Sequence, residues 1–230
     1  MSEATPIVVL SSGGKDSLFM LDRLRHDPSW CVEALVTTVN ETNGRVAMHG
    51  TSGALLRAQA DALGLALRIV GLPENCDNRE YESRLAEGLR PFRERGIDTI
   101  ASGDLFVEDI RQWREESFRG MGWKVVFPIW QTPTADLARQ LTRDPWRVVI
   151  TCVDTQVLPE SLLGRTLDSG LLDGLPEGVD PCGENGEFHT FVCSGPGFGR
   201  TIGVTRGLTC LHHERYLMLD LESACSAPGG

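Results

Sequence analysis

An apolar stretch that ends in a glycine-rich polar run constrains the fold more than any other feature of this sequence. Residues 7–10 have the sequence IVVL, which is typical of a buried strand, and residues 11–17 have the sequence SSGGKDS. Adjacent glycines allow a tight turn with close backbone approach, and a helix that begins there presents N–H groups and the positive end of its dipole. The sequence therefore predicts a strand, a turn and a helix with an anion site at the turn.

The residue types in this run suit phosphate. Lys15 supplies a mobile positive charge for a phosphate, and Asp16 is expected to lie near Mg²⁺ or to cap the helix. The spacing differs from the GxxxxGK[ST] loop, because both glycines directly precede the lysine. An ordinary glycine-rich turn is the alternative interpretation. The residues expected to line this phosphate site are Ser11, Ser12, Gly13, Gly14, Lys15, Asp16 and Ser17.

Strand-like and helix-like segments alternate through the first half, as in a parallel sheet covered by helices. A polar segment, residues 40–53, predicts a long loop, and Pro91 is expected to bend or stop a helix. The expected strands are 7–10, 32–39, 67–70, 97–101 and 125–127, and the expected helices are 16–26, 54–63, 81–89 and 107–119.

Beyond Pro128 the pattern is less regular. The expected elements are a helix over 134–141 capped by Thr132 or Thr134, a buried strand over 147–153, a partly helical stretch over 162–175, and strands over 188–192, 201–204 and 216–221. We therefore predict an α/β protein with a parallel Rossmann-like sheet domain over residues 1–128 and a smaller α/β domain over residues 129–230.

Composition narrows the class of protein. The seven cysteines form no CxxC pair, which is a poor zinc or disulfide framework and favours a reducing cytoplasm. No apolar run approaches the roughly 20 residues that cross a bilayer, and the N-terminus lacks the features of a signal peptide. With 22 Lys and Arg against 32 Asp and Glu, the net charge is −10, which argues against nucleic acid as a partner.

A second group of polar residues lies in the segment 178–191. Glu187 and His189 are two apart on an expected strand, so their side chains share one face and could hold magnesium, orient an amine or accept a proton. Asn185 and Gly186 equally fit a type I′ hairpin turn, with Glu184 and Glu187 in solvent on either side. Spacing alone leaves both interpretations open.

Four segments, in order, resemble the diphthine–ammonia ligase family. Residues 12–17 (SGGKDS) are similar to the PP-loop of ATP pyrophosphatases, and Asp109, Arg114 and Glu116 stand in place of a D-x-x-x-x-R-x-E helix. Residues 163–168 (LGRTLD) match LG[KR]xLD, and residues 183–191 (GENGEFHTF) are similar to GEGGEYETF. Asn185 stands where these ligases have glycine, and His189 stands where they have glutamate.

The resemblance implies an adenine nucleotide alpha hydrolase-like (HUP-type) N-terminal domain and ATP and Mg²⁺ as cofactors. The implied reaction is amide formation through adenylation of a carboxylate, with release of AMP and pyrophosphate. The implied partners are ATP, a small-molecule or protein-borne carboxylate acceptor, and ammonia or an amine; a homodimer is one option.

The same resemblance, with the reading of the fold, assigns the remaining site residues. Met48 and His49 lie where this fold commonly contacts adenine or ribose, and Gly103 and Asp104 follow an expected strand on the nucleotide side. The catalytic candidates are Lys15, Asp16, Glu184, Glu187 and His189. The substrate candidates are Asp109, Arg114, Glu116, Asn185 and Thr190, and the metal candidate is Asp16 for Mg²⁺.

Two alternatives remain. A tRNA-modifying PP-loop enzyme shares the glycine run, but the net charge of −10 and the lack of paired cysteines weigh against it. A non-catalytic adenine-nucleotide sensor would bind ATP or AMP without turnover, and the segment 184–190 would then be only a hairpin.

Overall fold

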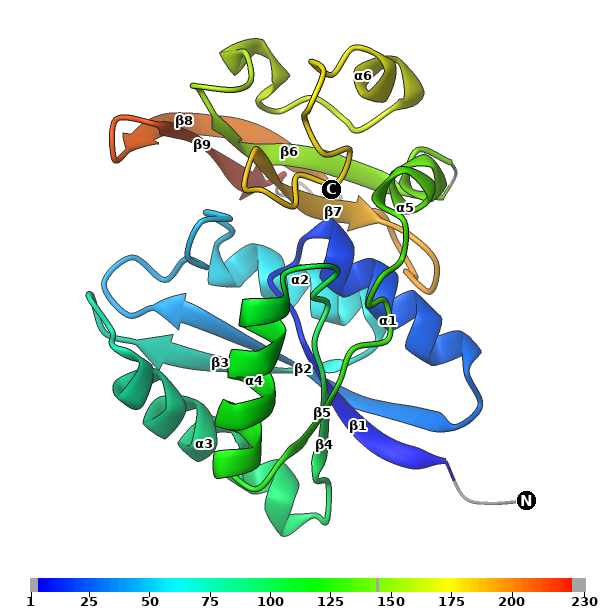
Figure 1. The fold of residues 1–230 in the computed structure, drawn as a ribbon, viewed down its shortest axis with the longest axis vertical. Coiled ribbons are helices and arrows are strands. Elements are labelled where there is room, and N and C mark those ends of the chain that lie inside the picture. The colour runs from blue at the N-terminus through cyan, green and yellow to red at the C-terminus, as the bar shows by residue number, and fades with distance from the viewer. Residues whose placement is uncertain (1–3, 144, 225–230) are drawn as a thin grey trace, which may run out of the picture. The chain divides into compact units, whose positions relative to one another are not determined.

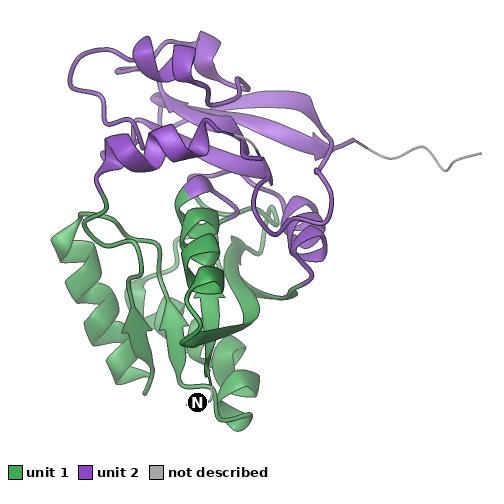
Figure 2. Ribbon diagram, turned by 90° about the vertical axis from the view of Figure 1, so that its right-hand side faces the viewer, with its two compact units in different colours: residues 1–12, 16–47, 65–132 green, residues 13–15, 48–64, 133–230 purple. Residues whose placement is uncertain are grey.

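The computed structural model describes residues 4–143 and 145–224, so Cys225 lies outside the described part. The chain forms two compact units, coloured separately in Figure 2. Unit 1 comprises residues 1–12, 16–47 and 65–132, and unit 2 comprises 13–15, 48–64 and 133–230. Two segments of the N-terminal half therefore group with the C-terminal residues, and the domain division at residue 128 stays a prediction.

Unit 1 contains a parallel five-stranded sheet in the order β3-β2-β1-β4-β5 (Figure 1). The expected α/β class is confirmed. Parallel neighbours need long crossovers, and helices supply them here. The strands are β1 (Thr5–Leu10), β2 (Trp30–Asn40), β3 (Ala66–Leu72), β4 (Thr99–Ala101) and β5 (Lys124–Val126).

The helices of unit 1 cover both faces of this sheet. On one face, α3 (Asn78–Glu94) and α4 (Glu108–Gly120) bury apolar side chains against the strands. The strand order reverses between β1 and β4, so right-handed crossovers place α1 (Lys15–His26) on the other face. The core of the first face is formed by Val8, Ala34, Val36, Val70, Leu85, Leu89, Phe92, Ile97, Ile100, Phe118 and Trp123.

Pro91 does not stop its helix, so this part of the prediction is wrong. Helix α3 continues to Glu94 with Pro91 inside it. A proline within a helix costs roughly 3 kcal/mol through a lost hydrogen bond and a steric clash. Leu85, Leu89 and Phe92 are each less than 10% exposed in the core, and this burial on both sides of the proline offsets the cost.

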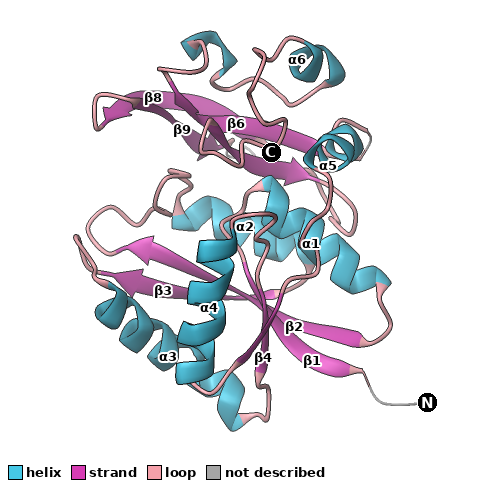
Figure 3. Cartoon of the chain, in the orientation of Figure 1, coloured by secondary structure: helices cyan, strands magenta, loops and turns pink. Residues whose placement is uncertain are grey.

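Unit 2 contains an antiparallel four-stranded sheet in the order β7-β6-β9-β8 (Figure 3). Its strands are β6 (Arg147–Asp154), β7 (Phe188–Ser194), β8 (Val204–His212) and β9 (Tyr216–Ser223). Its helices are α2 (Gly53–Leu63), α5 (Thr134–Leu141) and α6 (Ser169–Asp173), with a short 3₁₀ turn η1 (Glu160–Leu162). The stretch 162–175 is thus partly helical, as predicted.

Two local predictions in unit 2 are wrong, and one of the two interpretations of the turn at Asn185 and Gly186 does not hold. Helix α5 has Pro133 at its N-cap without a side-chain cap, and the Thr134 hydroxyl instead donates to Asp180 Oδ2 at 2.7 Å. The strand expected over 201–204 begins at Val204. The type I′ turn fails because Gly186 has φ 83° but Asn185 lies outside the positive-φ region, which both central residues of that turn require.

Along the described residues, no helix combines the length and the apolar character needed to cross a membrane.

Candidate active site

The order of the strands in unit 1 places two polar segments next to each other. β1 and β4 are neighbours at the point where the strand order reverses, and ligands of such sheets bind at the carboxyl ends of strands at this point. The glycine run follows β1, and Ser102, Gly103 and Asp104 follow β4. A Cβ on Gly103 would lie 3.3 Å from backbone atoms of Asp16 and Ser17, so glycine here allows the two segments to pack closely.

Asp104 is already engaged within unit 1. Its Oδ2 accepts a hydrogen bond from the Ser102 hydroxyl at 2.7 Å and lies 2.7 Å from Nε of Arg114 on α4. The Arg114 guanidinium lies 6.0 Å from the ring centroid of Trp113, and the Trp113 ring lies 5.6 Å from that of Tyr81. The pKa of Tyr81 lies above its ordinary value, because burial raises it more than the neighbouring Arg114 lowers it. None of the sequence motifs includes Tyr81.

The structure does not bring the other two residues of the α4 motif to this cluster. Asp109 and Glu116 are exposed, and Glu116 accepts a hydrogen bond from Gln112 on the same helix at 3.0 Å. Their assignment to substrate stays a prediction that no contact supports.

Buried hydroxyls lie at the end of β1 on one face of the sheet. The Ser11 hydroxyl donates to the Ser17 hydroxyl at 3.2 Å. Leu10 is paired with Val36, so Thr37 is in register with Ser11, and side chains in register share a face. Thr37 is 2% exposed, and its hydroxyl has no hydrogen-bond partner among the described residues.

Residues 13–15 of the glycine run lie against β7. The N–H of Lys15 donates to the Thr190 hydroxyl at 3.1 Å, and the N–H of Val192 donates to the Gly13 carbonyl at 3.0 Å. Thr190 is 1% exposed, so its hydroxyl faces the protein interior, where it accepts this hydrogen bond from the loop. The Lys15 side chain is 4% exposed, with Nζ 5.7 Å from the ring centroid of Phe188.

Two histidines meet beside this loop. The rings of His49 and His189 lie 4.6 Å apart, and a Cβ on Gly14 would come within 3.0 Å of His49. Met48, just before His49, has φ 60°. Burial, together with the nearby His49 and Lys15, lowers the pKa of His189 to about 3. His189 is therefore neutral near pH 7 and is a weak base, which does not favour the proton-accepting role.

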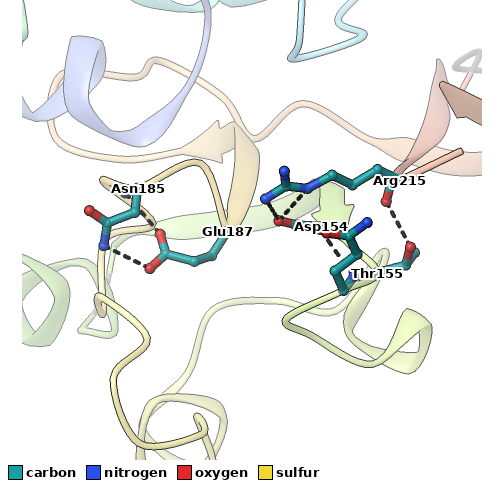
Figure 4. Close-up of polar contacts among 6 residues, drawn as sticks. Asp154, Thr155, Asn185, Glu187 and Arg215 are labelled. Carbon is teal, nitrogen blue, oxygen red and sulfur yellow. Dashed lines mark hydrogen bonds and ion pairs between the residues drawn. The ribbon is translucent and has the colours of Figure 1, made fainter. Parts of the chain in front are cut away.

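Glu187 holds the turn that precedes β7 (Figure 4). Its Oε1 accepts from the Asp180 N–H and from Asn185 Nδ2, both at 3.0 Å, and its Oε2 accepts from the Asn185 N–H at 2.9 Å. Burial alone would raise the pKa of Glu187, but these hydrogen bonds outweigh it and the pKa lies below its ordinary value. Glu187 is 5% exposed and ionised, and its carboxylate is occupied by its own turn.

Asp154 anchors a second part of unit 2 (Figure 4). Nε and a terminal guanidinium nitrogen of Arg215 lie 2.9 and 2.5 Å from Asp154 Oδ2, and the Thr155 hydroxyl donates to the Arg215 carbonyl at 2.8 Å. The Asp154 N–H donates to the Glu187 carbonyl at 2.9 Å. The end of β6 thus links the turn before β7 to the turn between β8 and β9. Glu184, by contrast, is half-buried, and its N–H donates to Asp180 Oδ1 at 3.4 Å.

The residues of the glycine run fit a nucleotide phosphate. Lys15 and the start of α1 supply positive charge, and Ser11 and Ser17 supply hydroxyls at the same end of β1. Residues 4–143 and 145–224 contain no group of three or more His, Cys, Asp or Glu side chains that could hold a metal ion. The half-buried Asp16 is the carboxylate of the run that could face a Mg²⁺ ion bound to such phosphates.

Comparisons with known proteins identify the family of this chain. The model of the diphthamide synthase N-terminal domain matches residues 5–125, and that of the diphthamide synthase C-terminal domain matches residues 133–224. This chain belongs to the diphthamide synthase family. The resemblance seen in the four sequence motifs is thereby confirmed.

Curated relatives carry a ligase name. The human protein named diphthine–ammonia ligase is 27% identical, in an alignment that covers 96% of this chain and 94% of the relative. The rat and mouse proteins of the same name are each 26% identical, over 90% of this chain and 85% of the relative. At the level of the family, these matches support a ligase.

Proposed function

We propose that this protein is an ATP-dependent amide-forming ligase that adenylates a carboxylate and releases AMP and pyrophosphate. The observation that carries this proposal is a buried lysine at the start of a helix, in a glycine run that follows β1 where the strand order reverses. Family membership supports the same reaction class.

Each residue of the run has a role in this proposal. Lys15 and the N-terminus of α1 bind the phosphates and stabilise negative charge on the departing pyrophosphate. The Ser11 and Ser17 hydroxyls would orient the phosphates, and Asp16 would help to hold Mg²⁺ on them. When bound, ATP with Mg²⁺ supplies the adenylyl group that makes the acceptor carboxylate reactive towards a nitrogen nucleophile.

The acceptor is a carboxylate, and the nucleophile is ammonia or an amine. The names of the relatives state diphthine and ammonia for those proteins. Here His189 is neutral where the family motif has glutamate, and Asn185 is hydrogen-bonded to Glu187 where the motif has glycine. We propose that these two differences change the acceptor and leave the use of ATP intact.

The identity of the products tests this proposal. The protein is incubated with ATP, Mg²⁺ and a cell extract that supplies acceptor and amine, with the Lys15→Ala variant in parallel. We expect AMP and pyrophosphate, formed by the wild-type protein above the level of the variant. ADP and phosphate as the wild-type products would contradict the proposal, and so would AMP formation that Lys15→Ala leaves unchanged.

A further inference from the structure

A buried glutamine connects the glycine run to β7. Gln59 lies on α2 and is 1% exposed. Its side-chain Nε2 donates to the Gly13 carbonyl at 3.1 Å and to the Val192 carbonyl at 2.8 Å. An amide NH₂ has two protons, and both are used here on backbone carbonyls. The same Gly13 carbonyl accepts from the Val192 N–H, so one loop atom receives two hydrogen bonds.

A second contact fixes the loop two residues further on. The Lys15 N–H donates to the Thr190 hydroxyl, which is buried on β7. Residues 13–15 are therefore held at both ends, by Gln59 and Val192 at Gly13 and by Thr190 at Lys15. The second contact sets the backbone from which the Lys15 side chain extends.

The sequence of the loop explains why it needs such support. Gly13 has φ 79°, and a pair of adjacent glycines loses more conformational freedom on ordering than other residues do. A Cβ on Gly13 would lie 3.0 Å from Leu56 on α2, so α2 packs against the loop as well as bonding to it. A loop that is ordered before its ligand arrives loses less entropy when it binds.

We propose that Gln59 and Thr190 are positioning residues that hold the glycine run in its ATP-binding conformation. This inference rests on the proposed function of the run. The family resemblance assigned Thr190 to the substrate, whereas this proposal assigns it to the loop. The proposal also adds Gln59, which belongs to none of the four motifs. The pattern of α2 does contain a signal, because Gln59 shares a buried helical face with Leu55, Leu56 and Leu63.

Binding of a non-hydrolysable ATP analogue with Mg²⁺, measured by calorimetry, tests this proposal on the full chain. Thr190→Val keeps the shape of the side chain and removes the acceptor, whereas Thr190→Ser keeps the hydroxyl. Gln59→Met keeps the length and removes both donors. Thr151→Val is the matched control, because Thr151 is 2% exposed in β6 and its hydroxyl has no hydrogen-bond partner among the described residues.

We expect the Kd to rise about 3- to 10-fold in Thr190→Val and in Gln59→Met, as the loss of one or two hydrogen bonds implies. Thr190→Ser and Thr151→Val should bind like the wild-type protein. In turnover, the KM for ATP should rise while kcat at saturating ATP is retained, since the loop still reaches its active conformation once ATP is bound.

The outcomes separate the two proposals. Equal Kd values for the wild-type protein, Thr190→Val and Gln59→Met, with unchanged circular dichroism, would overturn the positioning roles and leave ATP binding intact. If Gln59→Met does not fold, the comparison of Thr190→Val with Thr190→Ser decides alone. A wild-type protein that does not bind the analogue would overturn the proposed function itself.

Discussion

The glycine run at residues 11–17 and the turn at residues 180–187 are both glycine-containing segments, but they are stabilised in opposite ways. The run is held from outside, because Gln59, Thr190 and Val192 supply the partners of Gly13 and Lys15. The turn is held mainly from inside, because the carboxylate of Glu187 accepts hydrogen bonds from residues of the same turn. The Thr134 hydroxyl and the Asp154 N–H add hydrogen bonds from outside it.

This difference changes how the motif residues are interpreted. A glutamate in a motif is a natural catalytic candidate, yet Glu187 is occupied by its own turn. Lys15, in contrast, has its backbone fixed by β7 and presents a buried cation at the start of α1. A variant of Lys15 should therefore affect chemistry, and a variant of Glu187 should first affect folding.

The largest effect is expected in the run. Lys15→Ala removes the charge that, in the proposed reaction, stabilises the leaving pyrophosphate, and we expect AMP formation to fall by about 100- to 1,000-fold. The measurement is kcat/KM for ATP. Lys124→Ala is the control, because Lys124 is exposed in an ion pair with Asp98 and should retain wild-type activity. A fall of less than about tenfold in Lys15→Ala would remove the main distinction between the run and the turn.

The next effect is expected in the turn. Glu187→Gln removes the charge and places an NH₂ group against the N–H donors of Asp180 and Asn185. We expect the free energy of unfolding to fall by about 1.5–3 kcal/mol, as for hydrogen bonds to a charged group. Urea unfolding measures it, with Glu177→Gln, at an exposed residue of the same unit, as the control. Wild-type stability together with lost turnover would instead make Glu187 a catalytic residue.

A smaller effect is expected at low pH. The hydrogen bond and charge of Arg215 hold the pKa of Asp154 below its ordinary value, against the opposing effect of burial. The ion pair therefore stabilises the fold above the unfolded pKa of about 3.9, and this stability is lost as the pH falls through the folded pKa. Asp154→Asn should remove about 1 kcal/mol at pH 7 and less at lower pH. Urea unfolding between pH 7 and pH 2 measures this, and equal pH slopes for both proteins would contradict it.

The smallest effect is expected at His189. Because burial and neighbouring His49 and Lys15 lower its pKa to about 3, its ring should stay neutral through the physiological range. Nuclear magnetic resonance of the histidine ring protons should show one signal without a titration step above roughly pH 4. The signal of the His189 ring is identified by being absent from the spectrum of His189→Gln. A titration step between pH 5 and 8 would show that the ring is charged when the ligand arrives.

Sequence patterns predicted the parallel sheet well, because each strand and helix of unit 1 carries its own apolar period. A buried strand such as β1, in which Ile7, Val8 and Val9 are fully buried, is recognised from its own run of apolar residues, without knowledge of the strands that pair with it. The pattern could not show that Pro91 stays inside α3, because burial of Phe92 against distant strands offsets the cost of the proline.

The sequence motifs predicted which residues belong to the candidate site better than they predicted what each residue does. The motifs named Lys15, Thr190 and Glu187, but roles depend on contacts between residues far apart in the chain. Thr190 lies 175 positions from Lys15, and the amide of Gln59 reaches Val192 across 133 positions. No local pattern encodes such pairs. His49 and His189 likewise meet only in the folded unit.

Hydrogen–deuterium exchange with and without a non-hydrolysable ATP analogue and Mg²⁺ shows whether the glycine run binds ATP, because it locates the nucleotide on the chain without requiring turnover. We expect slower exchange in residues 11–18 on adding the analogue, and no such change in Lys15→Ala. Unchanged exchange in residues 11–18 of the wild-type protein, with protection confined to another segment, would show that the glycine run does not bind ATP.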